Sequence, residues 1–590
     1  MSESSDSQIR GEDVDTTLRS IYSSCFPALH RQYVNPEETR AAIRRAILDT
    51  IHDSPRVLID TVSGQLCDKS EQAASFESLP IFNNLISSMT TRIDDVRIKQ
   101  DVTKYYRYGM FSHNWEDNEP LFDQVVRNVV YDLEQSLTHD KLKMFCKMVW
   151  DAGLHWAWSD TCCINKADDC ALQEAILTRF KWYEGSALTI VFLCDILSPS
   201  RRGDLTKSIW NSRARAWQEY CASKVIRFYT RDWKLYMNFD IPNHKDSPEI
   251  ISEMEEATGV WVQALISLRP GLDDIRVKLW LASTRQTTLV EDVACSLFGI
   301  FPTSLPVVYG EGEVLGRLLA QLLTSSGDAS ILSWTGESGS FNSCLPSNIT
   351  VFNQLPPPHI PLAMPRSKME KTIAGLGASS LLATNLYDRL GKLPVVSFSG
   401  QRMKLPCLIF GLGPVTGTWN AGGRVFRAPT DVLGIVEIRT EEDLSQLNPL
   451  YLVHPWMDFL LDRQPVGSVI ATLPEENADE PPLAPIVPEA PEFASRPELP
   501  FGRQTATHPK DPLFLYPPSL LSSEDKWSRA LQVIARLKLP FGALLLTRHR
   551  GEIYAYRRVA VETLITVQVQ EITPAVLKKL VSSVQVLDVL

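Results

Sequence analysis

Four short β-prone runs alternate with helical patterns between residues 100 and 235, and this alternation constrains the fold of the chain most strongly. The run Ala187–Asp195 is continuously apolar and closes with an aspartate, which is typical of a strand buried on both faces. The other runs are Tyr105–Trp115, a short apolar segment that stops at Trp158, and Val225–Tyr229. Each run predicts a strand.

The segments between these runs have the spacing of amphipathic helices. Apolar residues recur there at helical intervals, namely Leu142, Phe145, Cys146 and Val149 in one segment and Leu172, Ile176, Phe180 and Tyr183 in the next. The resulting order β-α-β-α-β-α-β predicts an α/β fold in which helices cover a parallel sheet.

Polar residues cluster where the predicted strands end. The set consists of Ser112, His113, Asp160, Cys162, Cys163 and Asp195. In open parallel sheets, ligands bind beyond the carboxyl ends of the strands. We therefore expect these side chains to line a common site at one edge of the sheet.

The chain is too long for a single core, and its 590 residues predict roughly three to four domains. It carries 59 Lys and Arg residues against 70 Asp and Glu residues, a net charge of −11, without a basic stripe, so nucleic acid is not expected as a partner. No apolar run approaches the ~18 residues that span a bilayer, so we expect no membrane span.

The 11 cysteines lack the regular spacing of a disulfide framework, and the N-terminal residues MSESSDSQIRGEDVD do not resemble a signal peptide. Both features predict an intracellular, cytoplasmic location. Cys162, Cys163 and Cys170 form no Cys-x-x-Cys pair, so neither a metal site nor a bound cofactor is expected there.

Changes in composition divide the chain into segments. The expected segments are 1–15 (disordered), 16–99 (helical), 100–335 (a domain with an α/β core at 100–235 and a helical part at 236–335), 336–464 (a mixed domain with strands), 465–512 (a Pro-rich disordered insertion) and 513–590 (a C-terminal α/β segment). The second half of the chain would thus form a smaller mixed α/β domain.

Four motifs resemble the fungal heterokaryon-incompatibility (HET) domain, in the order that the family shows. They are SHNW at 112–115, WSDTCCINK at 158–166, WQEYCASKVIRFYTRDW at 217–233 and STRQTTLVEDVACSLFGIFPTSLPVVYGEGE at 283–313. The resemblance implies a fungal protein of nonself recognition, in which the domain triggers programmed cell death after incompatible cells fuse.

The HET domain in turn resembles the Toll/interleukin-1 receptor (TIR) domain, which implies a TIR/flavodoxin-like parallel sheet. Enzymatic TIR members cleave NAD with a glutamate that lies near a tryptophan, and Glu219 beside Trp217 occupies the matching place. The resemblance makes Glu219 the candidate catalytic residue and NAD the candidate substrate. Residues expected to contact this ligand are Ser112, His113, Asp160, Cys163 and Trp217.

The chain departs from the family pattern at three places. Residues 213–217 (RARAW) stand where Arg-Gly-Trp-Thr is expected, Asn165 replaces an aspartate, and residues 114–116 (NWE) replace Thr-Trp-Gly. Because of these departures, a weakened or lost activity is an alternative to the activity that the resemblance implies.

Each candidate residue also has a structural interpretation. Glu219 would be an ordinary ion-pair partner of Arg213 or Arg215, Asp160 a helix N-cap, and His113 a packing residue beside Trp115. Cys163 would be a packing residue or, alternatively, the nucleophile of a triad with His113 and Asp160.

Three functions follow from these interpretations. The first is a cell-death effector that cleaves NAD. The second is a non-catalytic signalling module that self-associates or recruits an unidentified protein partner. The third is a thiol-dependent hydrolase built on Cys163. Whether the chain is an enzyme stays open at this point.

Overall fold

The computed structural model describes residues 34–259, 269–283, 290–303, 305, 313–354, 380–420, 423–447, 449–457, 523–552 and 554–590. The stretches predicted to be disordered, 1–15 and 465–512, lie outside these residues. Among the described helices, none combines the length and the apolar character that a bilayer span requires.

The N-terminal half is built on a six-stranded sheet with the order β2-β1-β4-β3-β5-β6. Its strands are β1 (Leu58–Asp60), β2 (Leu66–Cys67), β3 (Tyr108–His113), β4 (Trp156–Trp158), β5 (Leu188–Leu193) and β6 (Ile226–Thr230). β4, β3, β5 and β6 pair in parallel, as the α/β pattern predicts. The chain is therefore a mixed α/β protein.

The sheet is not purely parallel, in contrast to the sequence-based expectation. β1 pairs antiparallel with β4 and with β2. β1 and β2 come from the segment that was predicted to be helical. With three and two residues, these strands are too short to show an alternating pattern in the sequence. A turn at Gly64, with φ +75°, connects them.

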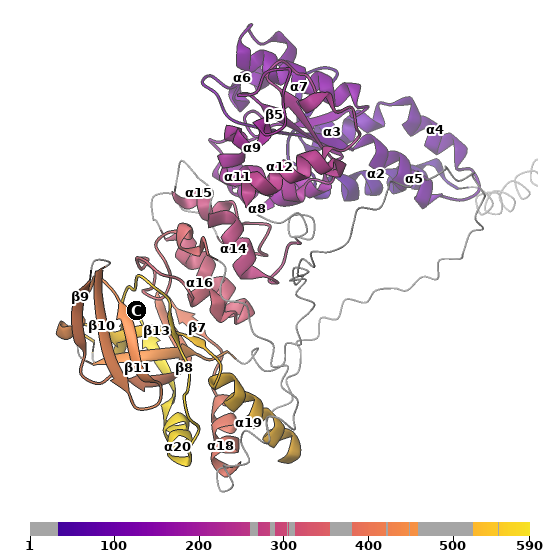
Figure 1. Ribbon diagram of the computed structural model, residues 1–590. Helices are drawn as coiled ribbons and strands as arrows, with labels where there is room; N and C mark the ends of the chain where they lie inside the picture. The colour runs from indigo at the N-terminus through magenta and orange to yellow at the C-terminus, as the bar shows by residue number, and fades with distance from the viewer. Residues whose placement is uncertain are drawn as a thin grey trace, which may run out of the picture.

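Helices pack on both faces of this sheet (Figure 1). Among the helices of this half, α7 and α11 contact β3. The helices are α2 (Pro36–His52), α3 (Lys69–Glu77), α4 (Pro80–Ser88), α5 (Asp95–Tyr105), α6 (Phe122–Arg127), α7 (Leu137–Asp151), α8 (Asp169–Gly185), α9 (Asp204–Lys207), α10 (Ile209–Ser212), α11 (Ala214–Ala222) and α12 (Pro248–Thr258).

The two faces of β3 meet different helices. The Tyr108 hydroxyl donates to the Trp182 carbonyl of α8 at 2.7 Å. A Cβ on the next residue, Gly109, would lie 2.7 Å from Val149 of α7. Because successive side chains of a strand point to opposite faces, even-numbered residues of β3 face α8 and odd-numbered residues face α7.

The connecting part of the chain contains α14 (Ile275–Ser283), α15 (Val290–Cys295), α16 (Val314–Ser326), and the 3-10 helices η4 (Ala329–Leu332) and η5 (Ile349–Phe352). Figure 1 shows α14 and α16 between the α/β unit and the C-terminal strands. Gly299, at φ +83°, follows α15, and a Cβ there would lie 2.3 Å from the Cβ of Phe180 in α8. The left-handed turn thus lets the connecting part lie against α8.

The C-terminal half contains a closed barrel. Its strands pair in the order β12-β13-β14-β16-β8, and β8 pairs again with β12, so five strands form a ring. β7 extends the ring at β8, β15 pairs with β13, and β9, β10 and β11 form a separate sheet. The bounds are β7 (Ser397–Ser399), β8 (Arg402–Gly411), β9 (Thr416–Asn420), β10 (Gly423–Thr430), β11 (Gly434–Arg439), β12 (Leu450–Pro455), β13 (Phe541–Arg548), β14 (Ala555–Arg558), β15 (Ile565–Val567) and β16 (Val584–Val589).

Both sides of the predicted insertion contribute to this barrel. β8 and β12 precede residues 465–512, and β13, β14 and β16 follow them. The helices α18 (Ser380–Leu390), α19 (Ser523–Leu537) and α20 (Pro574–Ser583) belong to the same half. Their apolar residues pack with one face of the barrel strands, such as Leu408 and Leu545.

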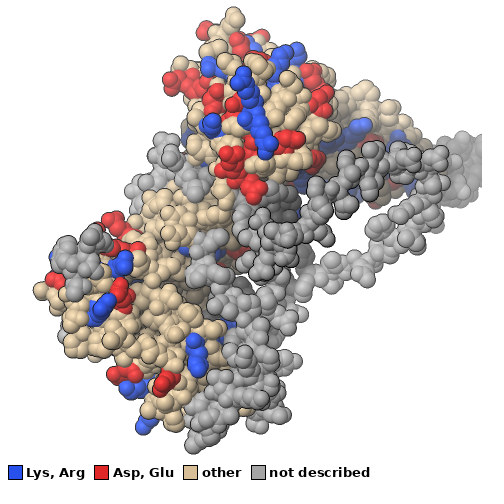
Figure 2. All heavy atoms as spheres, in the orientation of Figure 1, with Lys and Arg blue, Asp and Glu red and all other residues tan. Residues whose placement is uncertain are grey.

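The opposite face of the barrel strands, which includes Leu405 and Leu544, belongs to a large apolar cluster that continues through the connecting part into the six-stranded sheet. Arg558 of β14 reinforces this junction, because its guanidinium donates to the carbonyls of Leu332 at 2.9 Å and Trp334 at 2.5 Å. The guanidinium carbon also lies 3.7 Å from the centre of the Trp334 ring. On the face drawn in Figure 2, acidic and basic side chains are intermixed over the α/β unit.

Candidate functional site

Ser112 and Glu219 meet at the carboxyl end of β3. The Ser112 side chain points to the α8 face, and its Oγ donates to Glu219 Oε2 of α11 at 2.5 Å. The Trp210 Nε1 of α10 donates to the same Oγ at 2.8 Å. Ser112 and Glu219 are only 1% and 2% exposed. Two helices and a strand end therefore hold one buried carboxylate in a fixed position.

Arg179 of α8 links this carboxylate to Asp160, which follows β4. Its Nη1 lies 3.3 Å from Asp160 Oδ2 and 3.7 Å from Glu219 Oε1. Both carboxylates thus share one buried guanidinium. The three residues lie where the strand order reverses between β3 and its neighbours β4 and β5, which is where open α/β sheets bind ligands.

The two carboxylates differ in their tendency to ionise. Burial raises the pKa of Glu219 above its ordinary value, and Arg213 and Arg179 only partly oppose this effect. Burial would also raise the pKa of Asp160, but Arg179 and Arg213, with a hydrogen bond from Trp115, outweigh it and lower the pKa to about 2. Two carboxyl groups with separated pKa values are the arrangement that supports acid and base roles in one site.

His113 lies on the other face of β3, away from Ser112. Its ring stacks on Phe111 with 4.2 Å between the ring centres, and Nε2 is 3.7 Å from Glu119 Oε1. Neither ring nitrogen has a hydrogen-bond partner among the described residues. Burial and the nearby Lys141 lower the pKa of His113 well below its usual range, so the ring is neutral.

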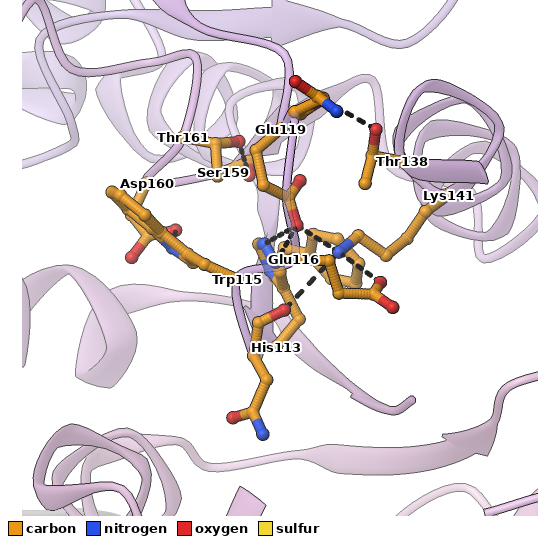
Figure 3. Close-up of polar contacts among 12 residues, drawn as sticks. His113, Trp115, Glu116, Glu119, Thr138, Lys141, Ser159, Asp160 and Thr161 are labelled. Atoms are coloured by element: carbon orange, nitrogen blue, oxygen red, sulfur yellow. Dashed lines mark hydrogen bonds and ion pairs between the residues drawn. The ribbon is translucent and has the colours of Figure 1, made fainter. Parts of the chain in front are cut away.

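Lys141 of α7 is the centre of the polar contacts on this second face (Figure 3). Its Nζ contacts Glu119 Oε1, lies 3.1 Å from Glu116 Oε2 and donates to the Asn114 carbonyl at 3.4 Å. The Lys141 side chain is only 2% exposed. It neutralises two carboxylates of the segment that follows β3.

Trp115, in the same segment, contacts the first cluster. Its Nε1 donates to Asp160 Oδ1 at 3.0 Å, and Figure 3 shows the two side chains facing each other. Lys166 Nζ lies 3.6 Å from the centre of the Trp115 ring. Trp115 is 47% exposed, whereas Asp160 is 5% exposed. The indole therefore lies between Asp160 and solvent.

Cys163 has the surroundings of a packing residue. It is buried, and its Sγ accepts a hydrogen bond from the Ser159 backbone N–H at 3.4 Å. Burial, with Cys162 next, raises the pKa of the Cys163 thiol well above its ordinary value, which disfavours the nucleophilic thiolate. The described contacts of His113 and Asp160 do not assemble a triad with it.

The structural interpretations of the glutamate and the aspartate need correction. The structural interpretation of Glu219 gave it Arg213 or Arg215 as a partner, whereas its described ion-pair contact is Arg179. Arg213 donates to the His113 carbonyl and still lowers the pKa of Glu219, and the Arg215 guanidinium lies 2.5 Å from the Asp292 carboxylate. The Asp160 carboxylate contacts Trp115 and Arg179, not a helix N-terminus. Trp217 is 2% exposed, and its Nε1 has no hydrogen-bond partner among the described residues.

Sequence reasoning did not identify Arg179, Trp210 or Lys141 as members of the site. Arg179 carried the clearest signal, because it lies beside Phe180 on the apolar stripe of Ile176 and Tyr183, where a charged residue has to face the sheet. Lys141 precedes Leu142 in the corresponding stripe of α7. In the described part of the chain, no group of three or more acidic, histidine or cysteine side chains is placed to hold a metal ion.

The chain is similar to the vegetative incompatibility protein HET-E-1 of Podospora anserina, with 30% identity over 216 residues. The match covers 35% of this chain and 15% of that protein. No family model and no solved structure matches the chain.

Proposed function

We propose that this protein acts in fungal vegetative incompatibility. We further propose that its α/β unit is a cell-death effector that cleaves NAD, with Glu219 as the catalytic residue. The similarity to HET-E-1, together with the HET motifs, supports the biological role. The chemical role rests on one observation above all: Ser112, Arg179 and Asp160 surround the Glu219 carboxylate at the carboxyl edge of the parallel strands.

The strand order is consistent with a TIR/flavodoxin-like sheet. In chain order, the four parallel strands lie 2-1-3-4, which is how flavodoxin-like sheets are arranged up to their fourth strand. From the resemblance to TIR domains, we expect the catalytic glutamate on a helix near this edge of the sheet. Glu219 lies on such a helix, α11.

The proposed reaction breaks the bond between C1′ of the ribose and the nicotinamide nitrogen. The electron pair leaves with the nicotinamide, a water oxygen bonds to C1′, and the water releases a proton, which gives ADP-ribose and nicotinamide. Positive charge develops on the ribose in the transition state, and a nearby carboxylate stabilises it. Asp160 is ionised at neutral pH for this role, and Glu219 orients the hydroxyl or water.

A non-catalytic signalling module is the second candidate. The observation that favours it is the burial of Glu219, which is 2% exposed and has both carboxylate oxygens in contact with protein groups. In this alternative the cluster stabilises the fold, and the protein acts by self-association or by recruiting a partner.

Nicotinamide release from NAD by the purified chain tests the first candidate, in dilute and in crowded solution. Glu219→Gln should abolish release. Glu253→Gln is the matched control, because Glu253 is 1% exposed and its carboxylate accepts a hydroxyl hydrogen bond from Tyr236 at 2.9 Å, outside the site. Release that survives Glu219→Gln would reject this role of Glu219.

Toxicity of the same variants in fungal cells separates the two candidates. Death that depends on Glu219 supports the effector. Death that persists in Glu219→Gln supports the signalling module. Cys163→Ala should leave both release and toxicity in place, because the thiol is buried and protonated.

A further inference from the structure

The buried position of Glu219 raises the question of how a substrate reaches it. Residues 114–121 connect β3 to α6 and lie beside the carboxyl edge of the sheet. A series of contacts leads inward from this segment: Trp115 donates to Asp160, Asp160 pairs with Arg179, and Arg179 approaches Glu219. Trp115 is the exposed end of this series.

The outer contact is weak enough to open. It consists of one hydrogen bond at 3.0 Å between Trp115 Nε1 and Asp160 Oδ1 and the Lys166 ammonium at 3.6 Å from the indole ring centre. The ring is 47% exposed, so only part of its surface is held by packing. One such hydrogen bond contributes about 0.5 to 1.5 kcal/mol net, so the indole can leave this position at a small cost in free energy.

The inner end of the segment is anchored more firmly. Lys141 of α7 binds Glu119 and Glu116 and donates to the Asn114 carbonyl, and Thr138 Oγ1 donates to the Asn118 carbonyl at 2.7 Å. Figure 3 shows Glu116, Glu119 and Thr138 gathered around Lys141. The segment is therefore tied to α7 on one side of β3 and touches the Glu219 cluster on the other through one indole.

We propose that residues 114–121 form a latch that controls access to Glu219, with Lys141 as its anchor and Trp115 as its closing contact. Displacement of the Trp115 indole exposes Asp160 first and Glu219 behind it, while the contacts to Lys141 keep the segment attached. The inference deepens the proposed function in one respect only: the residue to which access is controlled is the candidate catalytic glutamate.

Carboxyl labelling with a carbodiimide and glycine ethyl ester, read by mass spectrometry, measures access to Glu219 without any assumption about NAD. In the native protein, the exposed Glu134 should label and the buried Glu219 and Glu253 should not. Trp115→Phe removes the indole N–H and keeps a ring, so it should raise labelling of Glu219 roughly 2- to 10-fold, the factor expected from one lost hydrogen bond.

Two controls isolate the latch. Trp150→Phe changes a tryptophan that is 50% exposed on α7 and should leave Glu219 protected. Glu253, at a distance from the latch on α12, should stay protected in every variant, which shows that the protein remains folded. Glu116→Gln removes one of the Lys141 contacts and should raise labelling of Glu219 by a smaller factor.

Unchanged labelling of Glu219 in Trp115→Phe would overturn the latch, as would labelling that rises only together with that of Glu253. Nicotinamide release, measured in parallel, should rise in Trp115→Phe relative to Trp150→Phe. If labelling rises but no protein releases nicotinamide, the latch stands and the NAD-cleaving function fails. If the native protein releases nicotinamide and Trp115→Phe does so at the same rate, the latch does not control the reaction and the inference fails.

Discussion

Ser112 donates its hydroxyl to Glu219, which lies 107 residues further along the chain. The same oxygen accepts the indole N–H of Trp210, so one hydroxyl joins β3, α10 and α11. All three side chains are buried, and each of these polar groups depends on the others for its hydrogen bonds.

Replacing Ser112 by Ala should destabilise the α/β unit by about 1 to 3 kcal/mol, because it leaves a buried carboxylate oxygen and a buried indole N–H without their partner. Ser212→Ala is the control: its exposed hydroxyl donates to the Ile209 carbonyl on α10, and its loss should change stability by about 0.5 kcal/mol or less. Urea unfolding followed by tryptophan fluorescence measures both. Equal effects of the two substitutions would contradict the role given to Ser112.

Asp160 and Glu219 should change stability with pH in opposite directions. The folded protein lowers the pKa of Asp160 from 3.8 to about 2, so its contribution is present above about pH 4 and is lost as the pH falls through 2. Asp160→Asn should therefore destabilise the protein at pH 7 by about 2 kcal/mol, and the difference should shrink toward pH 2.

The pKa of Glu219 is raised, so its favourable contribution is present below its ordinary value of 4.5 and is lost as the pH rises through the pKa of the folded state. Glu219→Gln cannot ionise, so it should gain stability relative to the native protein as the pH rises above 4.5. Urea midpoints at pH 3, 5 and 7 give both trends. If Asp160→Asn and Glu219→Gln changed the stability at pH 7 in the same direction, the environments of the two carboxyl groups would not differ as described.

Gly299 should tolerate alanine less well than Gly153 does. Both have positive φ, at +83° and +76°, but a Cβ at Gly299 would lie 2.3 Å from Phe180 Cβ, whereas no atom lies within 4 Å at Gly153. Gly153→Ala should cost about 1 kcal/mol for the backbone conformation alone. Gly299→Ala should cost about 3 kcal/mol, because α8 and the connecting part have to separate. Thermal unfolding of the two variants compares them, and equal losses would contradict the close contact with Phe180.

Replacement by lysine should destabilise the protein more at Arg558 than at its neighbour Arg557. Arg558 is buried, and a lysine ammonium there cannot reach two carbonyls and stack on Trp334, so Arg558→Lys should cost about 1 to 3 kcal/mol. Arg557 pairs with Glu442 at 2.7 Å at a half-exposed position, and Arg557→Lys should cost less than about 1 kcal/mol. Denaturant unfolding of both variants provides the measurement. A larger loss in Arg557→Lys would reject the junction as described.

The sequence predicts the central α/β elements well because their signals are local. Ala187–Asp195 is apolar throughout and contains β5, and the stripe from Leu172 to Tyr183 lies within α8. β1 and β2 are too short for such a signal. The barrel has a different obstacle: β8 pairs with β16 across about 180 residues of chain, and no local pattern records which distant strands become neighbours.

The candidate site was predictable only in part. Strand ends located Ser112, His113 and Asp160, but alternation along β3 separates Ser112 from His113, which face different helices. The partner of Glu219 depends on how α8 packs beside α11, which sets Arg179 between two carboxylates. That contact follows from tertiary packing and not from the spacing of residues in either helix.

The closed barrel also sets an order of events during synthesis. β3, β4, β5, β6 and the helix α11, which carries Glu219, are complete by residue 230, so this part of the fold can assemble while β8 is still being made. The barrel cannot close until β16, at Val584–Val589, emerges and pairs with both β8 and β14. Leu587 of β16 is also part of the large apolar cluster that joins the barrel to the rest of the chain, so this cluster is complete only after the last strand is made.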